Sequence, residues 1–189
     1  MKDILSVLLL SFTALAVQPQ VDMDSTMKMY NRALGVECTY CHVDGDWKNA
    51  SKPQWQVAQN MGRMVQALNG EQLAKTSGVS CVTCHGGQNM PSRLPAEKWQ
   101  AIAAQWPASA AESSKTTMSV YSASLGVGCD HCHDPADWKS PVKPAFATAQ
   151  RMVAMFEVFP KFMPAGARTQ CYMCHKGNVR PAPRRRNQQ

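Results

Sequence analysis

The amino-acid sequence predicts a mainly α-helical chain with long loops, organised as two copies of one unit. No segment shows the sustained apolar–polar alternation of a β-strand. Apolar residues recur at helical spacing after Pro53, and proline is tolerated in the first turn of a helix. Residues 25–64 align with residues 116–155 at a constant offset of 91, which indicates an internal repeat.

The chain begins with an apolar segment. Lys2 precedes an apolar run from Ile4 to Val17, and Ala14–Ala16 fits a small-residue cleavage site. The run is shorter than the roughly 20 residues that a membrane-spanning helix needs. Because Asp3 weakens the positive charge before the run, residues 1–20 are interpreted as a signal peptide or as a retained N-terminal anchor. Either one places the rest of the chain in the periplasm or on the outer face of the cytoplasmic membrane.

Each copy of the repeat is predicted to contain a short helix followed by a longer one. The short helices are expected to begin at a Ser or Thr cap just before Met27 and Met118. The longer helices are expected to begin near Pro53 and Pro144. Asn69-Gly70 has the composition of a helix end and is expected to stop the first of them.

A short helix and a linker are expected between the two copies. Pro95–Trp99 opens this helix, Pro107 ends it, and Ala108–Lys115 is predicted to be the linker. The predicted organisation is residues 1–20 as signal or anchor, 21–92 as first repeat, 93–115 as helix and linker, 116–183 as second repeat, and 184–189 as a basic tail.

All eight cysteines lie in four copies of the motif Cys-x-x-Cys-His. This motif attaches c-type haem through two thioether bonds, and its His binds the iron. Disulfides and zinc sites also use paired cysteines, but neither explains a His after every second Cys. The motifs therefore predict four covalently bound haem c groups. The predicted haem-binding cysteines are Cys38, Cys41, Cys81, Cys84, Cys129, Cys132, Cys171 and Cys174, and the predicted proximal iron ligands are His42, His85, His133 and His175.

The motifs extend the repeat and define the fold class. The first and third motifs coincide at the offset of 91, and the second and fourth follow at an offset of 90. The chain is therefore predicted to be a multihaem cytochrome c with two pseudo-symmetric dihaem repeats. Four haems in so short a chain must lie close together, so we expect an electron carrier in which the protein tunes each potential.

The net charge of +7 would by itself fit nucleic acid or an anionic membrane surface. The propionates of four haems would balance most of it, so no nucleic-acid partner is expected. The Arg184–Arg186 run is interpreted as a solvated tail, with a docking patch as the alternative.

Histidine is too scarce to supply both axial ligands of every haem. The sequence has five histidines, and four are already assigned as proximal ligands. The fifth, His131, lies between the two cysteines of the third motif and is expected at the surface or facing a propionate. At least three haems must therefore take another ligand or stay open. Methionine is the usual alternative to histidine, and it raises the reduction potential.

The repeat selects candidates among the twelve methionines. Met27 and Met118 each lie 11 residues before the first Cys of the next motif, and both are predicted to be sixth ligands. Methionines on the longer helices are also repeated, and the repeat does not choose between the two members of each pair. These pairs are Met61 with Met64 and Met152 with Met155.

These residues resemble the tetrahaem cytochrome subunit of photosynthetic reaction centres. The similarity is specific in residues 58–65 and 78–88, around the second motif. The pattern Met-x6-Leu-Gly-Val-x-Cys-x-x-Cys-His of residues 27–42 and 118–133 also resembles that family. The resemblance extends over nearly all of Ser25 to Pro183.

The resemblance implies further assignments. In that family the first Met of each Met-x-x-Met pair is the ligand, which selects Met61 for the second haem and Met152 for the fourth. Some members bind the fourth haem through a His located before the second motif, but Glu71–Thr76 contains none. All four haems are then His/Met. The lipid-attachment cysteine that many members carry is missing, so membrane contact is expected through docking or the N-terminal segment.

The function implied by the resemblance is the re-reduction of the oxidised pigment pair of a reaction centre. The implied partners are redox proteins and the reaction-centre core subunits at the membrane surface. Two alternatives remain open: a respiratory or extracellular electron relay in a non-phototroph, and a multihaem reductase. A reductase would require an open iron site, and the repeated methionines leave no haem obviously open.

Overall fold

The computed structural model describes residues 22–74, 76 and 78–181. The predicted signal or anchor segment and the predicted basic tail lie outside these residues. The described part is mainly helical, as expected, and its β-structure consists of two isolated bridges, Val43–Asp46 and Asp134–Asp137. None of its helices is long and apolar enough to cross a membrane.

The chain folds into α-helices separated by loops and short 3-10 turns. The α-helices are α1 (Met23–Leu34), α2 (Pro53–Ala67), α3 (Cys81–His85), α4 (Ala96–Ala103), α5 (Glu112–Leu125), α6 (Pro144–Ala154) and α7 (Tyr172–His175). The shorter elements are η1 (Cys38–Tyr40), the π-helical turn η2 (Leu68–Gln72), η3 (Cys129–His131), η4 (Met155–Glu157) and η5 (Phe159–Lys161).

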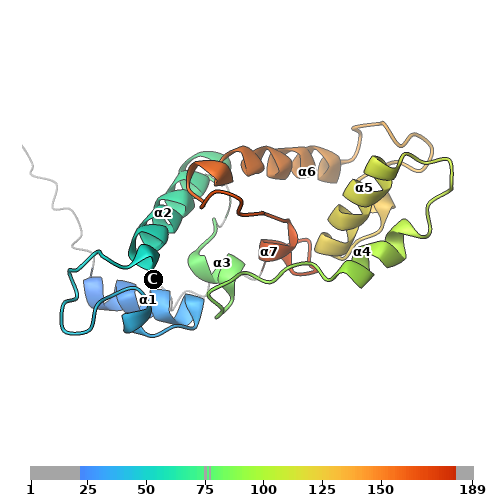
Figure 1. Ribbon diagram of the computed structural model, residues 1–189. Helices are drawn as coiled ribbons and strands as arrows, with labels where there is room; N and C mark the ends of the chain where they lie inside the picture. The colour runs from blue at the N-terminus through green and yellow to red at the C-terminus, as the bar shows by residue number, and fades with distance from the viewer. Residues whose placement is uncertain (1–21, 75, 77, 182–189) are drawn as a thin grey trace, which may run out of the picture.

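The molecule is elongated, and its two smallest α-helices lie in the middle (Figure 1). Helices α1 and α2 form one end, and α5 lies beside α4 at the other. Between them, α3 packs against α1 and α7 packs against α5, while α3 and α7 contact each other. The packing order is therefore α1, α3, α7, α5.

The buried core is small and lies where the two halves of the chain meet. It consists of Met64, Leu68 and Leu73 from the first half and Val158 from the second. Partly buried side chains of α2 and of the segment from α6 to η5 surround it. A core of this size is too small to stabilise the chain alone, which fits a protein packed around a bound cofactor.

The starts of α2 and α6 were predicted correctly, since each begins at its proline. The predicted caps of the short helices were wrong. Helix α1 is capped by Asp22, whose carboxylate accepts a 3.1 Å hydrogen bond from the backbone N–H of Asp24, and Ser25 lies inside the first turn. Helix α5 follows Ala111 without a side-chain cap, so the linker expected to reach Lys115 already ends there.

The predicted end of α2 was also wrong. The helix ends at Ala67, and the chain continues through Gly70 as the π-helical turn η2. Asn69 does not terminate the helix because its side chain has another role. Its amide donates to the carbonyl of Val79 at 2.9 Å and accepts from the N–H of Val79 at 2.8 Å. This pair of bonds ties the end of α2 to the segment that leads into Cys81.

Candidate haem-binding sites

The four motif histidines share one hydrogen-bond geometry. Each ring places Nδ1 within hydrogen-bond distance of a backbone carbonyl a few residues later in the chain. The contacts are His42 with Trp47 at 2.7 Å, His85 with Gln88 at 3.0 Å, His133 with Trp138 at 2.7 Å, and His175 with Asn178 at 3.0 Å.

This geometry leaves one nitrogen of each ring for a metal. A carbonyl oxygen has no proton to give, so Nδ1 must carry the proton and the lone pair must be on Nε2. A bond of this kind fixes the tautomer and orientation of metal-ligating histidines in proteins. Together with two adjacent cysteines, the donor set of each motif fits haem c.

The chain turns within each motif so that the Cys and His residues follow one another around a helical turn. In the first motif the N–H groups of Cys41 and His42 both donate to the carbonyl of Cys38, at 3.2 and 3.0 Å. The third motif forms the same 3-10 turn, with His133 bonded to Cys129 at 3.0 Å. The second and fourth motifs form the short helices α3 and α7.

The first turns of α2 and α6 support the first and third motifs in the same way. The Trp55 ring packs edge-on against His42 with centroids 4.8 Å apart, and Phe146 packs against His133 at 5.5 Å. The residue before each helix is a lysine, and its amine donates to a carbonyl inside the Cys-x-x-Cys turn: Lys52 to Thr39 and Lys143 to Asp130.

Paired glycines hold the two motifs of each half together. Gly35 ends α1 with a φ of 64°, and a β-carbon there would overlap the carbonyl oxygen of Gly87, just after the second motif. Gly126 and Gly177 repeat this contact in the second half. Left-handed φ and close backbone approach both require glycine, which explains the repeated Leu-Gly-Val sequence before the first and third motifs.

The second and fourth motifs meet in the middle of the molecule. The Cα atoms of Cys84 in α3 and Cys174 in α7 are 4.4 Å apart, and a disulfide joins the two residues. A sulfur that carries a thioether to haem cannot also form a disulfide, so the predicted role of both residues requires this bond to be absent from the haem-loaded protein. Since the first motif follows α1 and the third follows α5, the motifs are packed in the order first, second, fourth, third.

The structure distinguishes some of the candidate methionines. Met27 on α1 and Met118 on α5 are partly buried. Met64 is 9% exposed and belongs to the core, whereas Met61 lies one turn earlier and only packs against its edge. The thioether of Met64 is therefore already enclosed by protein, which favours Met61 as the ligand. Met152 and Met155 are both partly buried beside the core, so burial does not separate them.

Burial favours the neutral forms of several groups in the motifs. It raises the pKa of the Cys41, Cys132 and Cys171 thiols. It also lowers the pKa of His85, against the effect of the carbonyl of Gln88. Burial disfavours the charged form of a side chain, so these pKa shifts show that the motif residues lie in a poorly solvated environment, as packing against an apolar group requires. His131, by contrast, is exposed.

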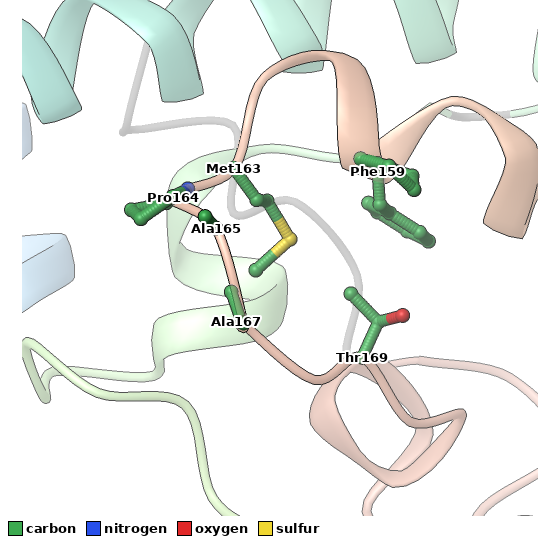
Figure 2. Close-up of a pocket in the computed structure, with 8 residues that line it drawn as sticks. Phe159, Met163, Pro164, Ala165, Ala167 and Thr169 are labelled. Atoms are coloured by element: carbon green, nitrogen blue, oxygen red, sulfur yellow. The ribbon is translucent and has the colours of Figure 1, made fainter.

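A pocket of about 130 Å³ is lined by η5 and by residues of the loop that leads from it to the fourth motif (Figure 2). Met163 and Phe159 point into it, and Thr169 lies at its far side. Met163 has no methionine counterpart in the first half, so the internal repeat gives no signal for it. Met163 also packs against the buried core.

Comparison with known proteins supports the same family. Residues 22–125 match the family of the photosynthetic reaction centre cytochrome c subunit. The chain is 38% identical over 56 residues to the photosynthetic reaction center cytochrome c subunit of Thermochromatium tepidum, which is 29% of this chain and 14% of that protein. It is 37% identical over 67 residues to cytochrome c-554 of Chloroflexus aurantiacus, 33% of this chain and 16% of that protein.

The two curated relatives are thus matched over about one sixth of their length or less. The family match covers more than half of this chain, from the cap of α1 through α5. It includes the first two motifs, the paired glycines Gly35 and Gly87, and the first-half methionines. The chain belongs to the family of photosynthetic reaction centre cytochrome c subunits.

Proposed function

We propose that this chain is an exported tetrahaem c-type cytochrome that transfers electrons and re-reduces the oxidised pigment pair of a reaction centre. The observation that carries the proposal is the shared geometry of the four motif histidines, each with Nδ1 occupied by a carbonyl and Nε2 left for iron. Membership of a cytochrome c family implies covalently bound haem, and four complete motifs support a count of four.

Haem iron, when bound, takes up and releases one electron at a potential set by its axial ligands and surroundings. The chain contributes the order and spacing of the attachment sites. Contacts between α1 and α3, between α3 and α7, and between α7 and α5 arrange the motifs in one series. The Cys84–Cys174 contact joins the two halves within that series. A pseudo-two-fold axis between the halves is part of the proposal, supported by the paired glycine and histidine contacts.

All four sites are proposed to be His/Met, with Met27, Met61, Met118 and Met152 as the sixth ligands. The exposed position of His131 and the core position of Met64 support this choice over the available alternatives. Iron atoms that are six-coordinate through protein side chains offer no site for a substrate. This favours a carrier over a multihaem reductase.

The proposed partners are redox proteins and the core subunits of a reaction centre. The chain would bind them at the outer face of the cytoplasmic membrane. Family membership supports this role. A respiratory or extracellular relay remains the second candidate, because it uses the same series of haem sites with another acceptor.

A flash experiment tests the proposed role. In membranes from the native host, a short light flash should oxidise this cytochrome in a fast phase. Membranes from a strain lacking the gene should lose that phase and regain it on complementation. Raising the salt concentration should slow the phase if charged residues such as the exposed Arg180 contribute to docking. A host without reaction centres, or a flash that leaves the protein reduced, would leave the relay as the function.

A further inference from the structure

Lys176 breaks the repeat at a position where the first half has glycine. The residue after the last His of the second motif is Gly86, and the corresponding residue after the fourth is Lys176. Both adopt the left-handed conformation, with φ of 60° at Gly86 and 50° at Lys176. Among the described residues, Lys176 is the one non-glycine residue with positive φ. A lysine in this conformation is strained where glycine would not be, which suggests that the side chain has a role.

The Lys176 side chain crosses from the fourth motif to the second. A β-carbon placed on Gly86 would lie 2.5 Å from Lys176 Nζ, so the amine occupies the space that the absence of a side chain at Gly86 leaves free. The lysine and the glycine therefore complement each other across the contact between α7 and α3. Gly86 directly follows His85, so the ammonium is held next to the iron-binding segment of the second motif.

No carboxylate of the described residues neutralises this charge. The two salt bridges among the described residues join Lys28 to Asp24 and Lys115 to Glu112, and neither involves Lys176. Lys176 is partly buried, so solvent screens its charge less than that of a surface lysine.

We propose that Lys176 raises the reduction potential of the haem bound through His85. The inference rests on the proposed function, since it requires haem at Cys81 and Cys84. Reduction removes one positive charge from the iron, so a fixed cation nearby favours the reduced state. Lys176 belongs to the fourth motif but acts on the haem of the second. It therefore gives the two central haems different reduction potentials.

The test separates the charge from the backbone. Lys176→Gln removes the charge and keeps a side chain at the left-handed position, Lys176→Gly restores the residue of the first half, and Lys176→Arg keeps the charge. We expect spectroelectrochemical titration of the haem-loaded protein to show one midpoint potential lowered in the Gln and Gly variants and retained in the Arg variant. Lys161→Gln, at an exposed lysine of the same half, is the control and should leave all midpoints in place.

Met61→His identifies the affected haem, because replacing Met by His lowers the potential of the site whose ligand changes. The midpoint lowered in Lys176→Gln should be the one lowered furthest in Met61→His.

Three results would overturn the inference: unchanged midpoints in Lys176→Gln and Lys176→Gly, an equal drop in Lys176→Arg, or a drop at a different haem. Haem content by mass spectrometry keeps the two proposals distinct: fewer than four haems on the wild-type protein contradicts the proposed function, whereas four haems with unmoved midpoints contradicts the role of Lys176 alone.

Discussion

The backbone N–H of Gly87 donates a 2.9 Å hydrogen bond to the carbonyl of Ala33, and Gly177 makes the same 2.9 Å bond to Ser124. These bonds join the turn after one haem motif to the helix that leads into another. The spacing between the two sites of each half is therefore set by backbone contact, and it depends on the glycines that permit that contact.

Gly35→Ala should destabilise the protein more than Gly45→Ala. Both positions have positive φ, 64° and 74°, so both variants bear the cost of a left-handed alanine. Only at Gly35 does the added methyl group meet backbone, the carbonyl of Gly87, and overpacking of this kind costs about 1–3 kcal/mol. Denaturant unfolding of the haem-loaded variants measures the difference. Equal stabilities would show that the close approach is unimportant.

Changing Met61 and Met64 to alanine should have different effects. Met61→Ala should weaken the sulfur-to-iron charge-transfer band of the ferric protein and lower one midpoint potential, because a thioether ligand raises the potential. Met64→Ala removes a core side chain that is 9% exposed and should cost about 2–5 kcal/mol of stability while leaving the band intact. The reverse pattern in spectrum and unfolding would assign the ligand to Met64.

Met27→Ala and Met118→Ala should each remove part of the same charge-transfer band. The two residues occupy corresponding positions before the first and third motifs, so each variant should lower the potential of a different haem. The double variant should show both losses added together, since the two sites belong to opposite ends of the molecule. A spectrum that neither single variant alters would refute both assignments.

Carbon monoxide should bind the reduced wild-type protein poorly, because every iron is expected to have two protein ligands. Met27→Ala, which opens one site, should bind the gas rapidly and serves as the positive control. Optical titration of both proteins gives the stoichiometry. Rapid binding of one equivalent by the wild-type protein would favour the reductase.

The features that the sequence predicted are those encoded locally or by repetition. Cys-x-x-Cys-His is complete in itself, and Pro53 and Pro144 mark helix starts through their own geometry. The cap of α1 was misplaced because Asp22 and Ser25 are both suitable residues, and only the fold decides which lies outside the first turn. Asn69 resembled a helix end, but its amide pairs with Val79, a partner ten residues later.

The remaining features depend on contacts between segments far apart in the chain. The repeat showed that Gly35 recurs as Gly126, but not that each glycine meets a second glycine beyond the next motif. The contact between Lys176 and Gly86 likewise depends on α7 lying against α3.

The mass of the intact protein, isolated from cells that export and mature it, tests the central claim most directly. We expect the mass of the chain plus four haem groups, with all eight cysteines consumed in thioether bonds and none left to react with a thiol reagent. Fewer than four haems on the mature protein, or a disulfide between Cys84 and Cys174 in its haem-loaded form, would contradict it.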